Sequence, residues 1–317
     1  MTTDSKKNTG LSLLKSVGVI GIFLYLLGAI AGFSGTLRLI TDFGRYGFLL
    51  LFVVSGFLIA KSLDECGDFK AVLKFWLKKA IKLLLLYYLY LLIMLLINTV
   101  GFKKSVGIGF LKQVFLLTGI VKSGDSLLFT FVHIYALYLV VAPILYVFLK
   151  LNKVWKLAIA FFVFYGLNIL QSRFFGGYGS FFKYAYVFTE GMLLYAATKE
   201  NRLNITYLSA LFIACVMLAL GKISDLFVSL LFVMLAGFCY NLEIRCKPIN
   251  FITGLIDDRC YSALISMAIV FYVLSNVNYP PAVAIAVAVI GTLALTILFN
   301  DIFLEFTAKL LTKKLLK

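Results

Sequence analysis

The sequence predicts an all-α fold, a polytopic transmembrane helical bundle of about 10 spans, and three observations favour this class. Hydrophobic residues make up 62% of the 317 residues, while charged residues make up only 14%. The mean hydropathy of +1.02 exceeds that of a soluble domain with a polar surface. The apolar residues also form segments of roughly 20, which is the length of a helix that crosses a hydrocarbon core about 30 Å thick. We therefore expect one membrane domain over residues 1–317.

Ten segments have the length and composition of a span. The first directly follows MTTDSKKNTG. Because no small-residue cleavage site accompanies it, we interpret it as a span and not as a signal peptide. The predicted spans lie near 12–33, 46–63, 80–100, 128–149, 154–171, 178–198, 203–221, 224–242, 255–276 and 281–303. No linker that would separate a second domain occurs between them.

The segment 105–121, SVGIGFLKQVFLLTGIV, is ambiguous. It is apolar but short, and it contains Lys112, Gln113 and several glycines. The residues alone are compatible with an eleventh span or with a helix that lies at the membrane interface.

The distribution of basic residues favours ten spans with both termini inside. Short cytoplasmic loops hold an excess of lysine and arginine. In a ten-span arrangement, the inner face receives Lys6, Lys7, Lys70, Lys74, Lys78, Lys79, Lys150, Lys153, Lys156, Lys199, Arg202, Arg245, Lys247 and the tail lysines. Eleven spans would place the basic tail outside. Residues 304–317 are therefore predicted to be a basic amphipathic cytoplasmic tail on the inner membrane surface.

The net charge of +16 is explained by the same arrangement. The lysines lie in short loops beside apolar spans, where anionic lipid headgroups attract them, so we expect membrane lipid and no nucleic acid as a partner. The five cysteines show no metal-type spacing, and we expect no metal. No Walker loop, GxGxxG or HExxH occurs in the sequence, so local motifs support neither nucleotide-driven transport nor zinc hydrolysis.

Four segments in a fixed order resemble the acyltransferase-3 family of integral membrane acyltransferases. They are ITDFGRYGFLLLFVVSGFLIAKSLDE, KFWLKKAIKLLLLYYLYLLI, FVHIYALYLVVAPIL and FTEGMLLYAATKENR. Together with the ten-span count, their order and spacing cover most of the chain. The resemblance implies an O-acyltransferase of the cell membrane, a bacterial plasma membrane, that takes an acyl group, often acetyl, from cytoplasmic acyl-CoA. The implied acceptor is a hydroxyl on an extracytoplasmic envelope glycan or lipid-linked sugar.

Three positions depart from the family pattern. Family members carry a histidine in the first helix, eleven residues after a basic residue. Here Lys15 matches the basic residue, and Leu26 stands at the place of the histidine. The paired arginines before the third helix correspond to Lys79 and Lys82, which keep the charge but not the bidentate fork of arginine. A catalytically inactive relative that binds or transports a glycan or lipid is therefore the alternative. A transporter of unrelated type is disfavoured, because inverted repeats are not apparent.

Two ionisable residues within predicted spans are the candidate catalytic residues. His133 is the only histidine and lies in the outer third of the span 128–149. It is either a hydrogen-bonded packing residue or a substitute general base. Glu190 lies inside the span 178–198, where an ionisable group is costly. It is either a neutral or paired glutamate, or it positions a donor or carries a proton.

Four basic residues are the candidate substrate-binding residues. Arg38 and Arg45 flank TDFG between the first two spans, where they either anchor the interface or hold an anionic part of a glycan or donor. Lys79 and Lys82, at the place of the family's paired arginines, are the other two. The charged triplet from Asp257 to Arg259 is expected to be a partly solvated cluster at the inner start of a span, with coenzyme contact as the alternative. Ser55 and Gly56, inside an apolar span, are expected to serve helix packing.

Overall fold

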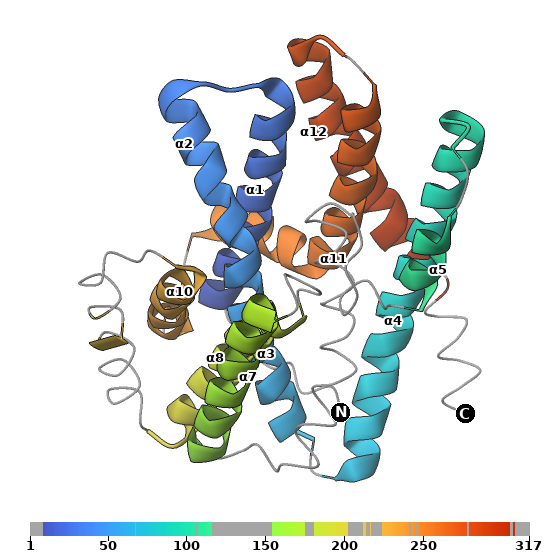
Figure 1. The fold of residues 1–317 in the computed structure, drawn as a ribbon. Coiled ribbons are helices and arrows are strands. Elements are labelled where there is room, and N and C mark those ends of the chain that lie inside the picture. The colour runs from blue at the N-terminus through green and yellow to red at the C-terminus, as the bar shows by residue number, and fades with distance from the viewer. Residues whose placement is uncertain are drawn as a thin grey trace.

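The computed structural model describes most of the chain, and helices account for the regular structure. It describes residues 9–66, 68–104, 107–115, 154–174, 181–201, 224–240, 242–244, 246–277 and 279–304, together with residues 212, 213, 216 and 307. No strand occurs among them (Figure 1). The elements are α1 (Thr9–Ala31), α2 (Gly35–Phe43), the 3₁₀ turn η1 (Gly44–Tyr46), α3 (Gly47–Asp64), α4 (Phe69–Leu96), the π-helix η2 (Ile97–Gly101), α5 (Ile108–Val114), α7 (Val154–Phe174), α8 (Phe181–Lys199), α10 (Asp225–Tyr240), α11 (Lys247–Asn276), α12 (Pro281–Ile297) and the π-helix η4 (Leu298–Leu304).

Six helical segments are long and apolar enough to cross a membrane. They are Thr9–Ala31, Gly35–Asp64, Phe69–Gly101, Val154–Arg173, Lys247–Asn276 and Pro281–Leu304. The helices α8 and α10, with 19 and 16 residues, coincide with two further predicted spans. The predicted span 128–149 lies outside the described residues, as does 203–221 apart from residues 212, 213 and 216. The all-helical membrane class is confirmed, while the count of ten and the orientation stay predictions.

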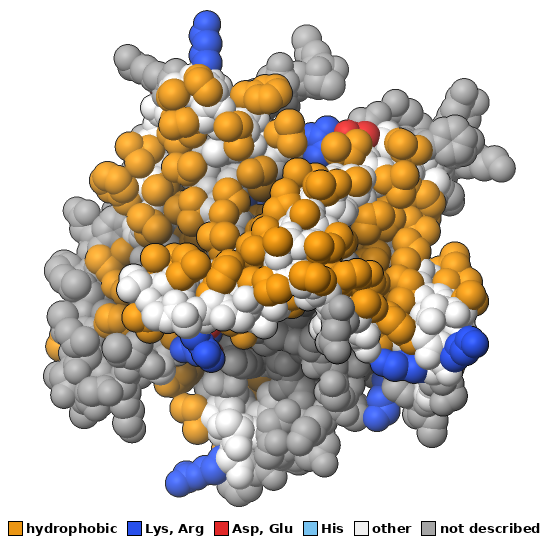
Figure 2. Space-filling model, turned by 90° about the horizontal axis from the view of Figure 1, so that it is seen from above, with side chains coloured by type: hydrophobic (Ala, Val, Ile, Leu, Met, Phe, Trp, Pro, Cys, Tyr) orange, Lys and Arg blue, Asp and Glu red, His pale blue; other side chains and the backbone are white. Residues whose placement is uncertain are grey.

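Apolar side chains cover much of the surface, as contact with lipid requires. In the view from above, hydrophobic side chains dominate the visible face and lysine and arginine side chains are scattered (Figure 2). Large apolar side chains such as Leu39, Phe43 and Phe162 are more than 60% exposed. In water such a surface would aggregate, so it indicates a hydrocarbon environment.

Two helices begin well before the predicted spans, and a third lies between two of them. Helix α4 begins at Phe69, well before residue 80, because Asp68 caps it and accepts a hydrogen bond from the Ala71 amide at 2.8 Å. Helix α11 begins at Lys247, with a proline in its first turn. The segment between the first two predicted spans, expected to be a loop, is largely the helix α2. Several basic residues that were predicted to lie in loops are therefore part of helices, and the helix fixes the direction of each side chain.

Helix α3 is the centre of the bundle and packs against α1, α8 and α10 (Figure 1). Its contact with α8 depends on two facing glycines. A Cβ atom added to Gly56 would lie 2.1 Å from the Phe188 carbonyl oxygen, and one added to Gly191 would lie 2.0 Å from the Val53 carbonyl oxygen. Small residues allow such close approach between membrane helices. The packing role predicted for Gly56 is confirmed.

The ambiguous segment 105–121 contains the short helix α5. Its seven residues span about 10 Å, which is too short to cross a membrane. The helix is tied to α4, since the Tyr87 hydroxyl donates to the Gln113 carbonyl at 2.6 Å and the Tyr88 hydroxyl donates to the Val114 carbonyl at 3.3 Å. The described part of this segment is therefore not itself a span.

Cys66, just after the end of α3, offers a test of this local packing. Its thiol donates to the Ser62 carbonyl at 3.2 Å, and burial, with help from the nearby Glu65 and Asp68, raises the pKa of the Cys66 thiol. Only the thiolate reacts with iodoacetamide. In a single-cysteine variant, we expect the alkylation rate at Cys66 to keep rising above about pH 9. A rate that levels off below that pH would show that the thiol is solvated.

Candidate functional site

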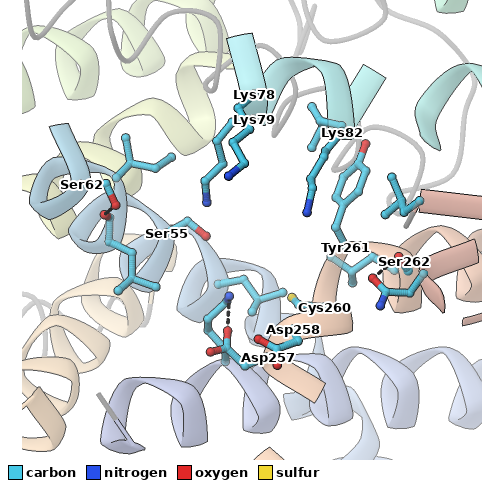
Figure 3. Close-up of a pocket in the computed structure, with 18 of the residues that line it drawn as sticks. Ser55, Ser62, Lys78, Lys79, Lys82, Asp257, Asp258, Cys260, Tyr261 and Ser262 are labelled. Atoms are coloured by element: carbon cyan, nitrogen blue, oxygen red, sulfur yellow. Dashed lines mark hydrogen bonds and ion pairs between the residues drawn. The ribbon is translucent and has the colours of Figure 1, made fainter. Parts of the chain in front are cut away.

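A cavity of about 430 Å³ lies where α1, α3, α4, α11 and η4 meet, and charged side chains line it (Figure 3). It is at the end of the bundle where α1, α4 and α11 begin and where α3 and η4 end. Its lining residues are Lys15, Leu51, Ser55, Leu58, Ile59, Ser62, Phe75, Lys78, Lys79, Lys82, Leu83, Asp257, Asp258, Cys260, Tyr261, Ser262, Leu264, Asn300 and Leu304. Four ammonium groups and two carboxylates therefore share one partly apolar space.

Three of these ammonium groups belong to α4. Lys82 follows Lys79 by three residues and Lys78 by four, which places it on the same side of the helix as both. Figure 3 shows their side chains pointing into the cavity. Lys79 also lies against the Phe75 ring, with Nζ 5.6 Å from its centroid. Within the described part of the chain, no carboxylate forms an ion pair with these three lysines. All three side chains are exposed, so their charges are available to an anionic ligand.

The fourth lysine, Lys15 of α1, is already neutralised. It forms an ion pair with Asp257 of α11, and the Ser12 hydroxyl donates to Asp257 Oδ2 at 2.7 Å. The two charged side chains are only 16% and 14% exposed. A buried charge requires a partner, so this pair fastens α1 to α11 beside the cavity. The lysines of α4 are thus the cations that remain for a ligand.

We expect the Asp257→Asn substitution to destabilise the protein by about 2 kcal/mol, because it leaves the Lys15 ammonium poorly solvated and unpaired. The loss is smaller than for a fully buried pair, since both groups keep some contact with water. The double substitution Lys15→Met with Asp257→Asn removes both charges and should recover most of this loss. Thermal unfolding in detergent measures both variants. Equal stability of the single and double variants would contradict a stabilising ion pair.

A π-helical segment supplies the remaining wall of the cavity. In η4, the Asn300 amide donates to Asp301 Oδ1 at 2.8 Å, and Asn300 Oδ1 lies 3.5 Å from the Ser262 hydroxyl. Arg259 of α11 donates to both Asp301 oxygens, at 2.8 and 3.2 Å. π-Helical segments are frequent at functional sites because they redirect side chains. Two residues of the charged triplet therefore contact different elements, since Asp257 bonds to α1 and Arg259 bonds to η4.

The family assignment follows from the extent of one match. The family model described as an acyltransferase domain, Acyl_transf_3, matches residues 8–314, which is nearly the whole chain. The chain belongs to the acyltransferase-3 family. This confirms the resemblance carried by the four sequence segments. The chain matches none of the curated proteins and none of the solved structures with which it was compared.

The cavity of this acyltransferase-3 protein contains two of the predicted binding residues. Lys79 and Lys82 both line it. Arg38 and Arg45 do not. The Arg38 guanidinium lies 3.6 Å from the Asp42 carboxylate in an exposed pair on α2, whereas Arg45 donates to the Tyr46 hydroxyl at 2.6 Å and lies over that ring. Interfacial anchoring and substrate binding both stay predictions for these two arginines.

Of the two predicted catalytic residues of the acyltransferase-3 protein, Glu190 is described, and it does not line the cavity. Glu190 is 3% exposed between α8 and α10, where the Ser229 hydroxyl lies 3.1 Å from its Oε1 atom. Its Oε2 atom has no hydrogen-bond partner among the described residues. His133 lies outside the described residues. No group of three metal-ligating side chains occurs in the part of the chain that the structure describes.

Sequence reasoning missed the pairing of Lys15 with Asp257. Both charges occur near the start of apolar segments, and this was an available signal, because a charge in such a position needs a partner. The identity of that partner could not be predicted from the sequence, since the two residues are 242 positions apart. Lys78 was also missed as a cavity residue, because its segment was assigned to a loop.

Proposed function

We propose that this protein is an integral membrane O-acyltransferase that uses cytoplasmic acyl-CoA, most simply acetyl-CoA, as the donor. The observation that carries the proposal is the group of three α4 lysines in the cavity of an acyltransferase-3 protein. Acyl-CoA combines several phosphate charges with an apolar, flexible arm. A cavity with ammonium groups on one wall and leucines on the others suits such a molecule.

Lysine suits this donor-binding role as a set of point charges. A single ammonium lacks the fork that grips a phosphate bidentately, but several ammonium groups together attract a multiply charged anion. In the predicted orientation, with both termini inside, the cavity faces the cytoplasm. That is the compartment in which acyl-CoA is found. The predicted localisation, a bacterial plasma membrane, belongs to the same proposal, as does contact with anionic membrane lipid.

The proposed reaction is transfer of the acyl group to a hydroxyl of an envelope glycan or lipid-linked sugar. The acceptor oxygen attacks the thioester carbonyl carbon, the new C–O bond forms and the C–S bond breaks. The hydroxyl proton passes to a general base, and CoA leaves as a thiolate that takes up a proton. His133 is the candidate base because the pKa of a histidine lies near neutral pH. Glu190 is the second candidate, for proton transfer or donor positioning.

A catalytically inactive relative that binds or transports a glycan or lipid is the second candidate function. One observation favours it. Leu26 of α1, at the place where the family carries a histidine, is a partly buried apolar side chain that has no acid–base chemistry. In that case the cavity would bind a ligand without transferring an acyl group.

Two measurements on the purified full chain test the proposal. Binding of acetyl-CoA in detergent or nanodiscs is expected, and cells that express the protein should incorporate labelled acetyl groups into envelope glycans. His133→Ala should abolish the labelling and leave acetyl-CoA binding intact. Binding without protein-dependent labelling would favour the inactive relative. Absence of acetyl-CoA binding would overturn the proposed donor.

A further inference from the structure

Ser55 has an unusual environment for a serine in an apolar membrane helix. It lies near the middle of α3, is only 4% exposed and lines the cavity. A buried hydroxyl in a helix usually donates to the carbonyl four residues earlier, as the hydroxyls of Ser16, Ser62 and Ser266 do. No such bond, and no hydrogen bond to any described residue, is formed by the Ser55 hydroxyl.

The hydroxyl is directed at the cavity and away from the helix contact. Figure 3 shows it pointing into the space between α3, α4 and α11. The next residue, Gly56, faces α8 on another side of α3. Consecutive helical residues point about 100° apart, so one serves packing and the other serves the cavity. Of the two residues predicted to serve helix packing, Gly56 faces α8, whereas the Ser55 hydroxyl faces the cavity.

Ser55 lies towards the inner end of the cavity, away from the end at which α4 and α11 begin. From its first residue onward, α3 runs away from this inner end. Leu51, one turn before Ser55, is therefore the innermost α3 residue in the lining. The innermost residues from α4 and α11 are Leu83 and Leu264. All three leucines are at most 6% exposed. The innermost part of the lining is therefore formed by leucines, with Ser55 one turn of α3 away from Leu51.

We propose that the Ser55 hydroxyl donates a hydrogen bond to the carbonyl oxygen of the donor's acyl group, and that the leucines Leu51, Leu83 and Leu264 surround a short acyl chain. This inference rests on the proposed function, since it takes acyl-CoA as the ligand. A hydroxyl that forms no hydrogen bond to a described residue can donate to a ligand without losing an existing bond. A hydrogen bond to the carbonyl oxygen also stabilises the negative charge that develops there during attack.

The proposal separates the two ends of the donor. The α4 lysines contact the phosphates, which CoA and acetyl-CoA share, whereas Ser55 contacts the carbonyl, which only acetyl-CoA has. The quantity to measure is therefore the ratio of the dissociation constants of CoA and acetyl-CoA for the full chain. Ser55→Ala should lower the preference for acetyl-CoA by roughly five-fold, the equivalent of one neutral hydrogen bond, and leave CoA affinity unchanged.

Ser266→Ala is the matched control. Ser266 is a buried serine in an apolar helix that bonds to the Ser262 carbonyl at 2.8 Å and does not line the cavity. It should not change the ratio. If Ser55→Ala does not fold, Ser55→Cys keeps the shape and replaces a strong donor by a weak one, and the ratio should fall in the same direction.

Each outcome has one meaning. An unchanged ratio in both Ser55 variants would overturn the contact with the carbonyl. Equal weakening of CoA and acetyl-CoA would overturn it too, because the hydroxyl would then contact a phosphate or the pantetheine arm. Failure of the proposed function is distinguishable, since the wild-type chain would then bind neither CoA nor acetyl-CoA.

Discussion

Replacing Lys79 and Lys82 together by glutamine is expected to weaken acetyl-CoA binding by roughly 100-fold. Each ammonium that contacts a phosphate contributes about 1.5 kcal/mol or more, and two such contacts correspond to a factor of about 100 in affinity. Glutamine keeps much of the side chain's length and hydrogen-bonding capacity, so the charge is the main change. Isothermal titration or filter binding with labelled acetyl-CoA measures the effect, at low and at high salt. The wild-type affinity should fall with salt more steeply than that of the variant.

Lys74→Gln provides the control for this experiment. Lys74 is an exposed lysine on the same helix and does not line the cavity. Its replacement removes the same charge and should leave acetyl-CoA affinity close to that of the wild type. A third variant, Lys79→Arg with Lys82→Arg, restores the arginines expected from the family and should bind at least as tightly, because guanidinium groups bind phosphate bidentately. Wild-type affinity in the double glutamine variant would show that the donor lies elsewhere.

Gly56→Ala is expected to destabilise the bundle by about 2 to 3 kcal/mol, although alanine favours a helix more than glycine does. The added methyl group would lie 2.1 Å from the Phe188 carbonyl oxygen, which belongs to the backbone of α8 and does not rotate away. Overpacking of this kind costs about 1 to 3 kcal/mol, and here two whole helices have to separate. Thermal unfolding in detergent, or the monodisperse fraction after extraction, measures the loss.

Gly166→Ala is the matched control, since it makes the same substitution on the helix α7. Nothing lies within 4 Å of a Cβ atom added to Gly166. Only helix propensity changes there, and a gain of up to about 1 kcal/mol is expected. Gly191→Ala should resemble Gly56→Ala, and the double variant should cost less than the sum, because one displacement of α8 relieves both clashes. Similar stabilities for Gly56→Ala and Gly166→Ala would disprove the close contact between α3 and α8.

The extents of the helices were only partly predictable. Hydropathy locates the apolar part of a helix, but α4 and α11 begin in polar sequence before their apolar parts. The start of α4 is set by the Asp68 cap, a local contact that could have been recognised. The junction of α2 with α3, the 3₁₀ turn η1, depends instead on contacts with another helix. Gly44 and Gly47 allow α1 to contact this segment, with added Cβ atoms 2.1 Å from the Gly21 carbonyl oxygen and 2.5 Å from that of Gly18.

The amino-acid sequence by itself determined the membrane class, the family and the presence of Lys79 and Lys82 at the matching positions. These are properties of single segments, because the preference of each residue for lipid or water and the order of short motifs do not depend on which helices are neighbours. Only the tertiary structure decided that Lys15 pairs with Asp257, that Glu190 and the α4 lysines lie in different places, and that the Ser55 hydroxyl faces a cavity. Contacts between helices depend on how the helix surfaces pack. The local sequence around a residue does not indicate which distant residues will lie next to it.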